Sequence, residues 1–186
     1  MPDMKSSFRV RVGRFLSARG PRALVRRQDG NAAVEFALVA APFFALLIAI
    51  LETALVFFAQ QVLQTATTEA SRLIMTGQAQ SGAMTATQFQ QAVCNDTAVL
   101  FSCSGIYVNV QTFSSFSSVS QLNPLSNGNF NSAAMNYSIG TQGDIELVQV
   151  FYEWPVLTGP LSFNISNMNG NSRLLMATAV FRNEPY

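Results

Sequence analysis

The longest apolar run of the chain covers residues 32–59 and reads AAVEFALVAAPFFALLIAILETALVFFA. Its strongly polar side chains are Glu35, Glu52 and Thr53. A helix over residues 36–59 would be about 36 Å long, enough for a hydrocarbon core of roughly 30 Å. Because the run is apolar on every helical face and the rest of the chain is too small to surround it, we expect a single transmembrane helix and not a buried core helix.

The helical pattern continues past the apolar run to about residue 75. Apolar residues follow at helical spacing on one stripe: Val62, Ala66, Ala70 and Ile74. Gly77 and Gly82 then end or loosen the helix. Thr87 is a candidate cap for a second, short helix that runs to Cys94.

Three later stretches predict β-strands. Residues 106–113 and 147–154 alternate between apolar and polar positions, and residues 174–182 are rich in residues that favour strands. In the second stretch Val148, Val150, Tyr152 and Trp154 share one face, and Pro155 ends it. A three-stranded antiparallel sheet packed on the helix that leaves the membrane gives an α+β fold.

The segment 114–132 between the first two strands holds seven serines and four asparagines. This composition predicts a solvated loop.

Charge divides the chain into two parts. Residues 1–30 contain eight basic and two acidic residues, a net charge of +6, whereas residues 31–186 contain three basic and eight acidic residues, a net charge of −5. The basic residues of the first part are Lys5, Arg9, Arg11, Arg14, Arg19, Arg22, Arg26 and Arg27. Basic residues next to a membrane span remain cytoplasmic. We therefore expect a single-pass inner-membrane protein with its N-terminus inside and its C-terminus in the periplasm.

Three regions follow from this topology: a basic cytoplasmic leader (1–30), a transmembrane helix (31–59) and an extracytoplasmic head (60–186). Membrane lipid is then the partner of the span. The alternative partner of a basic tail is nucleic acid, which we do not expect, because the tail lacks interleaved aromatic residues and adjoins a membrane span.

The chain has two cysteines, Cys94 and Cys103, separated by eight residues in the region expected outside the cytoplasm. Such a short loop can be closed by a disulfide in an oxidising compartment. The alternative is a pair of buried free thiols.

No catalytic constellation is evident. The chain has no histidine, no Gly-rich phosphate loop and no G-x-S-x-G motif, and two cysteines are too few for a Cys-only zinc site. Four carboxylates of the head have the pattern of solvated positions: Asp144, Glu146, Glu153 and Glu184. We expect a protein that is not an enzyme and needs neither metal nor cofactor.

The junction between leader and span carries the most specific signal. A basic leader ends at Gly30, Asn31 follows, and Glu35 lies five residues beyond the glycine at the edge of the apolar helix. An acidic residue in a bilayer is costly, so it calls for a partner. The alternative is an interfacial residue near the cytoplasmic headgroups, where a helix N-terminus also favours an acid.

This junction resembles that of the type IV pilin superfamily. The resemblance implies cleavage by a prepilin peptidase between Gly30 and Asn31, and pairing of the new amine with Glu35, usually that of a neighbouring subunit. Opposite charges lower each other's burial cost in a low dielectric, and such a pair sets the register of packed helices.

The chain is similar, more closely, to TadE-like proteins of the tight-adherence (Flp) pilus system. The similarity rests on DGNAAVEFALVAAPFFALLIAILE, on QTATTEASRLIMTG, on the Cys94/Cys103 pair and on the terminal RNEPY. It implies a minor pilin or pseudopilin that acts in pilus assembly and surface adhesion, with the peptidase, other pilus subunits and assembly proteins as partners.

Two functional alternatives stay open: an uncleaved inner-membrane assembly-platform factor, and a membrane-anchored periplasmic binding or adhesin domain unrelated to pili. Glu52 also has two interpretations. It lies 17 residues beyond Glu35, or about 25 Å along a helix. It either snorkels to the headgroups or forms an intramembrane contact with another subunit.

Overall fold

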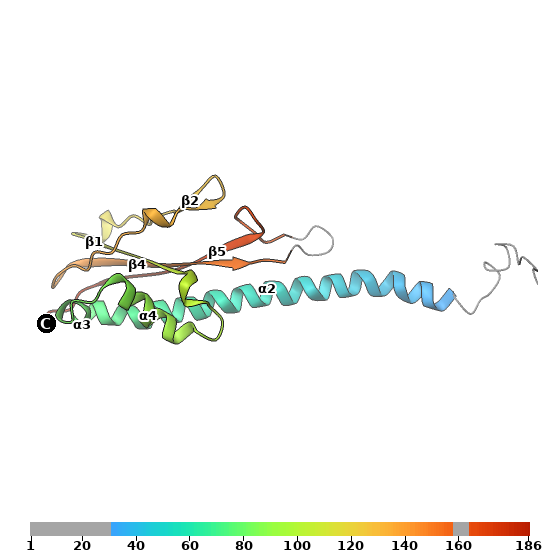
Figure 1. The fold of residues 1–186 in the computed structure, drawn as a ribbon, viewed down its shortest axis with the longest axis horizontal. Coiled ribbons are helices and arrows are strands. Elements are labelled where there is room, and N and C mark those ends of the chain that lie inside the picture. The colour runs from blue at the N-terminus through green and yellow to red at the C-terminus, as the bar shows by residue number, and fades with distance from the viewer. Residues whose placement is uncertain (1–30, 158–163) are drawn as a thin grey trace, which may run out of the picture. The chain divides into compact units, whose positions relative to one another are not determined.

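A computed structural model describes residues 31–157 and 164–186 (Figure 1). The predicted leader, including Gly30, lies outside these ranges. The α-helices and β-strands of the described part, in chain order, are α2 (Asn31–Met75), α3 (Gln78–Ser81), α4 (Ala86–Thr97), β1 (Ile106–Phe113), β2 (Leu125–Ser126), β3 (Asn129–Phe130), β4 (Ile145–Pro155) and β5 (Ser172–Arg182). A long apolar helix and a head with an antiparallel sheet of three strands, in the described part, confirm the predicted α+β class.

The described residues divide into two compact units, with the boundary between Phe43 and Phe44. Helix α2 contributes to both. The second unit therefore begins within the predicted span, and it contains the sheet, the short helices and the larger, C-terminal part of α2.

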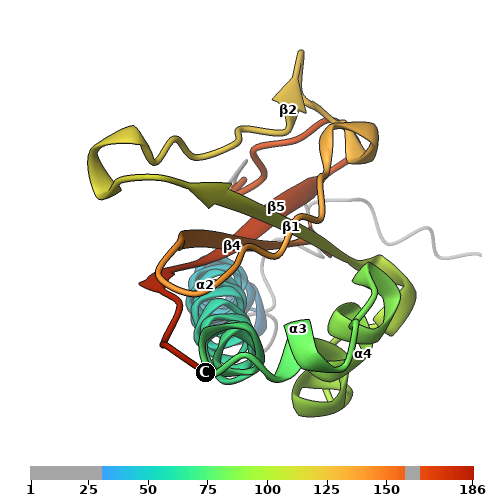
Figure 2. The same cartoon turned by 90° about the vertical axis from the view of Figure 1, so that its left-hand side faces the viewer.

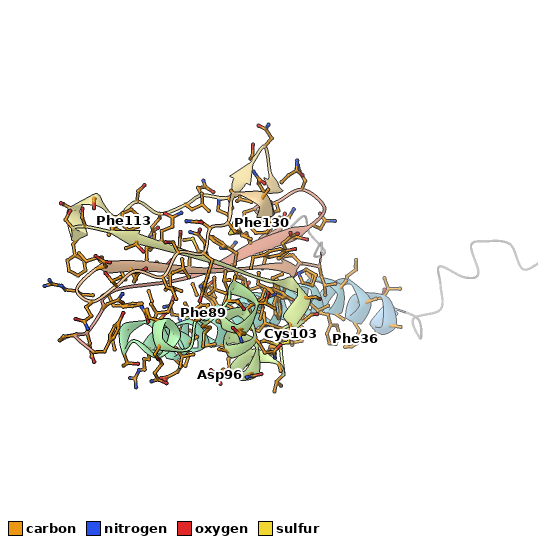
Figure 3. The ribbon with its side chains drawn as sticks, turned by 60° about the vertical axis from the view of Figure 1, so that its left-hand side comes forward. Phe36, Phe89, Asp96, Cys103, Phe113 and Phe130 are labelled. Carbon is orange, nitrogen blue, oxygen red and sulfur yellow. A yellow bond between two sulfur atoms is a disulfide. The ribbon has the colours of Figure 1, made fainter. Side chains whose placement is uncertain are left out.

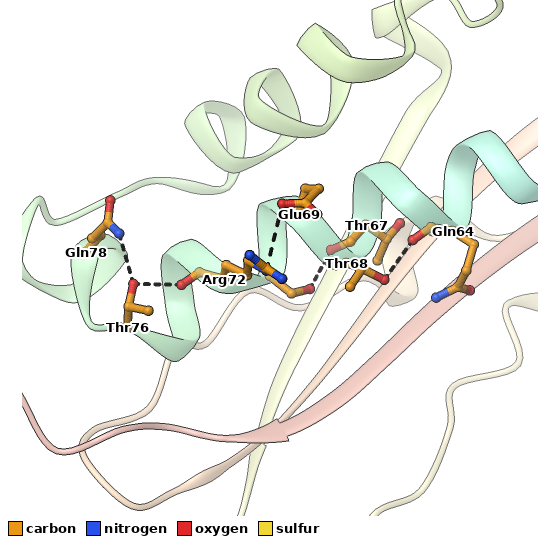
Figure 4. A network of polar contacts seen from close by, with 8 residues as sticks. Gln64, Thr67, Thr68, Glu69, Arg72, Thr76 and Gln78 are labelled. Atoms are coloured by element: carbon orange, nitrogen blue, oxygen red, sulfur yellow. Dashed lines mark hydrogen bonds and ion pairs between the residues drawn. The ribbon is translucent and has the colours of Figure 1, made fainter.

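Helix α2 is 45 residues long, about 67 Å at the usual rise per residue. In its last turns, hydroxyl side chains bond back to the carbonyl four residues earlier, as Thr67 does to Leu63 (2.7 Å) and Thr68 to Gln64 (2.9 Å; Figure 4). These bonds satisfy polar side chains without a distant partner. The helix ends at Met75, and Gly77 follows with φ +78°, as the sequence predicted.

The second helix begins earlier than predicted. Its N-cap is Thr85 and not Thr87, and it runs on to Thr97. The Thr85 hydroxyl accepts a hydrogen bond from the Gln88 backbone (3.3 Å), and the Gln88 side chain accepts one from the Thr85 N–H (2.8 Å). This capping box satisfies two amide groups reciprocally, an advantage that Thr87 lacks at its position.

The sheet has the order β1–β4–β5, with every neighbour antiparallel. β1 has the predicted bounds, and the other two strands are slightly longer than predicted. The face that carries Val148 and Val150 packs on α2 and α4, with Leu63, Ile74 and Phe89 buried against it. These residues form the main core.

Most residues of the segment 114–132 are exposed, as its composition predicted, but the segment is not only a solvated loop. It contains the β2–β3 pairing and, with the residues up to 134, lies over the second face of the sheet, opposite the helices (Figures 2 and 3). Phe130 packs against Tyr107 (4.8 Å between ring centroids) and Phe151 (6.1 Å). Leu122 exchanges two hydrogen bonds with the Gln149 side chain. β4 is consequently buried on both faces along most of its length.

Two glutamines of α2 bind the outer edge of β5. Gln64 donates to the Thr178 carbonyl (3.0 Å) and accepts from the Thr178 N–H (3.2 Å), and Gln60 donates to the Met176 carbonyl (2.7 Å). The side-chain amide of Gln64 thus satisfies the groups that a further strand would otherwise bond. An edge strand needs such cover, because unpaired backbone groups invite pairing with other chains.

The C-terminal residues return to the end of α2. The Glu184 N–H donates to the Met75 carbonyl (2.9 Å), and the Tyr186 ring lies against Gly77, where a Cβ would overlap it. The Gln142 amide donates to the Tyr186 carbonyl. The terminal RNEPY therefore links β5, the helix end and the loop before β4.

The capping box gives a first prediction. Thr85→Ala should lower the free energy of unfolding by about 1 kcal/mol, because it leaves helix amides without an acceptor. Urea unfolding of the full-length protein in detergent micelles measures this loss. Thr87→Ala is the matched control: it is exposed in the same turn and should change stability by less than about 0.5 kcal/mol. Equal losses in both variants would contradict the assigned cap.

Candidate functional site: an apolar helix and three carboxylates

The N-terminal half of α2 exposes nearly all of its apolar side chains. The large exposed residues between 31 and 51 are Val34, Phe36, Leu38, Val39, Phe43, Phe44, Leu46, Leu47, Ile48, Ile50 and Leu51. Only 6% of the most apolar window of this helix is buried. By length and composition the helix can cross a membrane. A soluble core helix would bury such residues, so this surface needs an apolar environment outside the described chain.

Glu35 lies on the first turns of this helix and is exposed. The Asn31 side-chain amide donates a hydrogen bond to its Oε1 (3.1 Å). Residues 31 and 35 are thus on one helix face and within reach of each other. The predicted cleavage and the counter-ion role of Glu35 stay predictions, since Gly30 lies outside the described residues.

Glu52 contacts the head. The sequence had suggested two other arrangements, snorkelling to the headgroups and an intramembrane contact with another subunit. The Oε1 of Glu52 accepts a hydrogen bond from the Leu157 N–H (2.7 Å). Among the described residues, its Oε2 is buried and has no hydrogen-bond partner. This carboxylate therefore joins α2 to the segment that follows β4.

Beyond Glu52 the head covers one side of α2. Val56 and Ala59 are buried, whereas Leu55, Phe57 and Phe58 on the other sides are exposed. The last two turns of the predicted span, residues 53–59, therefore have one face on protein. The stretch of α2 before Glu52 holds about 21 residues, about 31 Å, which matches a hydrocarbon core.

Cys94 and Cys103 are joined in the predicted disulfide, with their Cα atoms 5.4 Å apart. The bond connects α4 to the short 3-10 helix Cys103–Gly105 that leads into β1. Gln90 reinforces this junction by donating to the carbonyls of Cys103 (2.9 Å) and Ile106 (2.7 Å). The cross-link fixes α4 against the first strand.

Glu146 is buried, so its assignment as a solvated carboxylate was wrong. Its side chain accepts hydrogen bonds from the Gly140 N–H (2.7 Å), the Thr112 hydroxyl (3.1 Å) and the Asn183 amide (3.4 Å). A Cβ at Gly140 would overlap Oε1, so a larger residue at this position would displace the Glu146 carboxylate. The alternation of β4 could have revealed the burial, because residue 146 shares a face with Val148 and Val150.

The surroundings of Glu146 shift its protonation equilibrium. Burial raises the pKa of Glu146 to about 7 despite the opposing effect of its hydrogen bonds, and Asp144 adds a smaller increase. The pKa of Asp144 itself is lowered by hydrogen bonds from Thr141. Of the other head carboxylates, Glu153 and Glu184 are exposed, as predicted.

No group of three or more His, Cys, Asp or Glu residues within residues 31–157 and 164–186 could hold a metal ion. Glu35, Glu52 and Glu146 are each bonded separately to amide or hydroxyl groups. These carboxylates can accept hydrogen bonds and pair with positive charges.

Comparison with known families identifies one segment. Residues 30–72 match the family model described as TadE-like protein. This confirms, over that segment, the resemblance indicated by the sequence motifs, and it includes the junction at residues 30–35 and almost all of α2. Comparison with curated proteins and with solved structures gives no match.

The buried carboxylate predicts a pH dependence of stability. Since the pKa of Glu146 rises from 4.5 to about 7 on folding, the folded state binds more protons between these values. Stability should therefore fall as pH rises from 5 to 8, by on the order of 2 kcal/mol. Glu146→Gln should remove this fall, because a neutral amide carries no burial penalty for charge.

Urea unfolding of the full-length protein in micelles at pH 5, 6.5 and 8 measures this effect. Glu153→Gln, on an exposed position of the same strand, is the matched control and should retain the wild-type profile. The lowered pKa of Asp144 acts below about pH 4 and does not enter this window. Parallel profiles for wild type and Glu146→Gln would refute the assignment.

Proposed function

We propose that the protein is a minor pilin or pseudopilin of a tight-adherence (Flp) pilus, cleaved after Gly30 and contributing to pilus assembly and surface adhesion. The TadE-like match indicates involvement in assembly of the tight-adherence pilus. The observation that carries the proposal is the coincidence of this match, residues 30–72, with the helix that exposes its apolar side chains. An exposed apolar helix can exchange lipid for the helices of neighbouring subunits.

The proposed topology places residues 1–30 in the cytoplasm and the head outside. The excess of basic residues before α2 supports this orientation. The disulfide of the head agrees with an oxidising compartment. One long apolar helix is consistent with a single-pass anchor in the inner membrane.

In the proposed mechanism the peptidase frees the amine of Asn31, which lies on the same helix face as Glu35. A positive amine and a carboxylate in an apolar environment lower each other's desolvation cost. When the partner carboxylate belongs to a neighbouring subunit, the pair fixes the axial register of two helices. The partners are then the peptidase, pilus subunits and assembly proteins, and the protein acts as a structural component, not as an enzyme.

Two alternatives predict different outcomes. An uncleaved platform factor would keep residues 1–30 and stay in the inner membrane. A periplasmic adhesin unrelated to pili would keep its function when the peptidase is absent. Cleavage at the junction separates both alternatives from the proposal.

The first test is the mature N-terminus. In the native host, intact-mass measurement should give residues 31–186 when the prepilin peptidase is present and the uncleaved chain when it is absent. Gly30→Val should block cleavage, whereas Gly20→Val within the leader should leave it unchanged. An N-terminus other than Asn31, or cleavage that persists without the peptidase, would refute processing by this enzyme.

The second test concerns Glu35. Glu35→Gln should leave membrane insertion intact and reduce the number of pili by about tenfold or more, since a charge-assisted contact is lost. Membrane fractionation and counting of pili by electron microscopy measure the two effects. Glu69→Gln is the matched control, because Glu69 is an exposed acid of the same helix with only a 3.8 Å contact to Arg72. Normal piliation in Glu35→Gln would refute the counter-ion role.

A further inference from the structure

A pocket of about 150 Å³ lies where α2 meets the beginning of β5. One stripe of α2 supplies Thr53, Val56, Phe57 and Gln60, and the opposite wall consists of Ile165, Arg173 and Leu175. The walls are mostly apolar, with one cationic side chain. Figure 1 shows the start of β5 beside the middle of α2.

Arg173 gives the pocket its charge. Basic residues are rare after the leader: Arg72, Arg173 and Arg182. Arg72 lies in the last turn of α2, and Arg182 lies at the far end of β5, where its Nε donates to the Gly143 carbonyl (2.8 Å). Arg173 Nη1 donates to the Ile165 carbonyl (2.8 Å), which holds the guanidinium in the pocket wall. The remaining donors of the guanidinium fork suit a phosphate group.

The pocket follows directly on the part of α2 that exposes apolar side chains all round. Thr53 comes after Glu52, and Phe57 is 66% exposed at the pocket. Trp154 is the direct register partner of Arg173 on the neighbouring strand. Its ring packs with Phe101 (5.7 Å between centroids) and Tyr152 (6.3 Å). Trp, Tyr and Arg side chains next to an apolar helix are typical of the membrane–water interface.

We propose that this pocket binds one phospholipid of the bilayer that α2 crosses, through a hydrogen-bonded contact of the lipid phosphate with Arg173. The volume is too small for a whole lipid, so the pocket takes the glycerol–phosphate region while the acyl chains follow the exposed apolar side chains of α2 that precede Glu52. The proposal rests on the membrane anchoring in the proposed function, but it requires neither cleavage nor entry into a pilus. The site would fix the depth of the head on the membrane surface.

The experiment uses the full-length protein in nanodiscs that contain either phosphatidylglycerol or a phosphate-free galactolipid. Native mass spectrometry, after release into detergent, counts the retained lipids. We expect one retained phosphatidylglycerol and about tenfold less of the galactolipid, the discrimination of a charge-assisted hydrogen bond. The fluorescence of Trp154, the only tryptophan of the sequence, should be quenched by brominated phosphatidylglycerol in the same nanodiscs.

Arg173→Gln should lower lipid retention by about tenfold, because the guanidinium fork is lost. Arg182→Gln is the matched control. Arg182 is on the same strand and, like Arg173, donates to one backbone carbonyl, so this variant should retain the lipid. Thr53→Phe fills the pocket without altering Arg173 and should also displace the lipid. Thermal unfolding and the intact Cys94–Cys103 disulfide identify any variant that fails to fold.

Equal retention in wild type, Arg173→Gln and Thr53→Phe would overturn the proposal, as would equal retention of the galactolipid. Displacement of the lipid by inorganic phosphate alone, at constant ionic strength, would assign the site to a free anion and would equally overturn it. The result is independent of the pilus tests: loss of lipid binding with normal cleavage at Gly30 refutes only this inference. Normal lipid binding without cleavage refutes only the proposed processing.

Discussion

The structure of residues 44–186 depends on the attachment of the sheet edge to α2. Gln64 forms two hydrogen bonds with the backbone of Thr178, and Leu63, Ala66 and Ile74 on the adjoining helix positions are fully or almost fully buried. The polar contacts fix the register between helix and strand, while burial of the apolar side chains supplies most of the favourable free energy. The head is therefore an extension of the helix surface and not a domain on a flexible linker.

This attachment determines which part of α2 keeps its apolar side chains exposed. Glu52 accepts a hydrogen bond from the Leu157 N–H at the end of the head nearest the N-terminal part of α2. The large apolar side chains of α2 that precede Glu52 are exposed. A carboxylate with one bonded and one buried, unbonded oxygen is costly in a hydrocarbon environment. Its place at the junction is therefore expected to set how far α2 can enter the bilayer before the head meets the headgroups.

The long helix, the three strands and the disulfide were predictable, because each has a local signal: continuous apolar character, alternation or a composition that favours strands, or two cysteines in a short loop. The cap at Thr85, the burial of Glu146 and the role of segment 114–132 were not predicted. Thr85 depends on a reciprocal bond with Gln88, and Glu146 depends on Gly140, Thr112 and Asn183. The segment 114–132 is polar in composition, but Leu122 and Phe130 give it the contacts that cover the second sheet face. These features depend on residues that are distant in sequence, or on pairs that single-residue preferences do not show.

The position of β5 in the chain has a consequence for biogenesis. β5 is the strand that holds α2, yet it is formed by Ser172–Arg182, more than a hundred residues after Gln60 and Gln64. Contacts between residues so far apart form slowly. If the head is exported through the membrane, α2 is inserted long before its partner strand emerges, and the sheet stays open at that edge until translocation is almost complete. Such a nascent head would be a natural client of periplasmic chaperones.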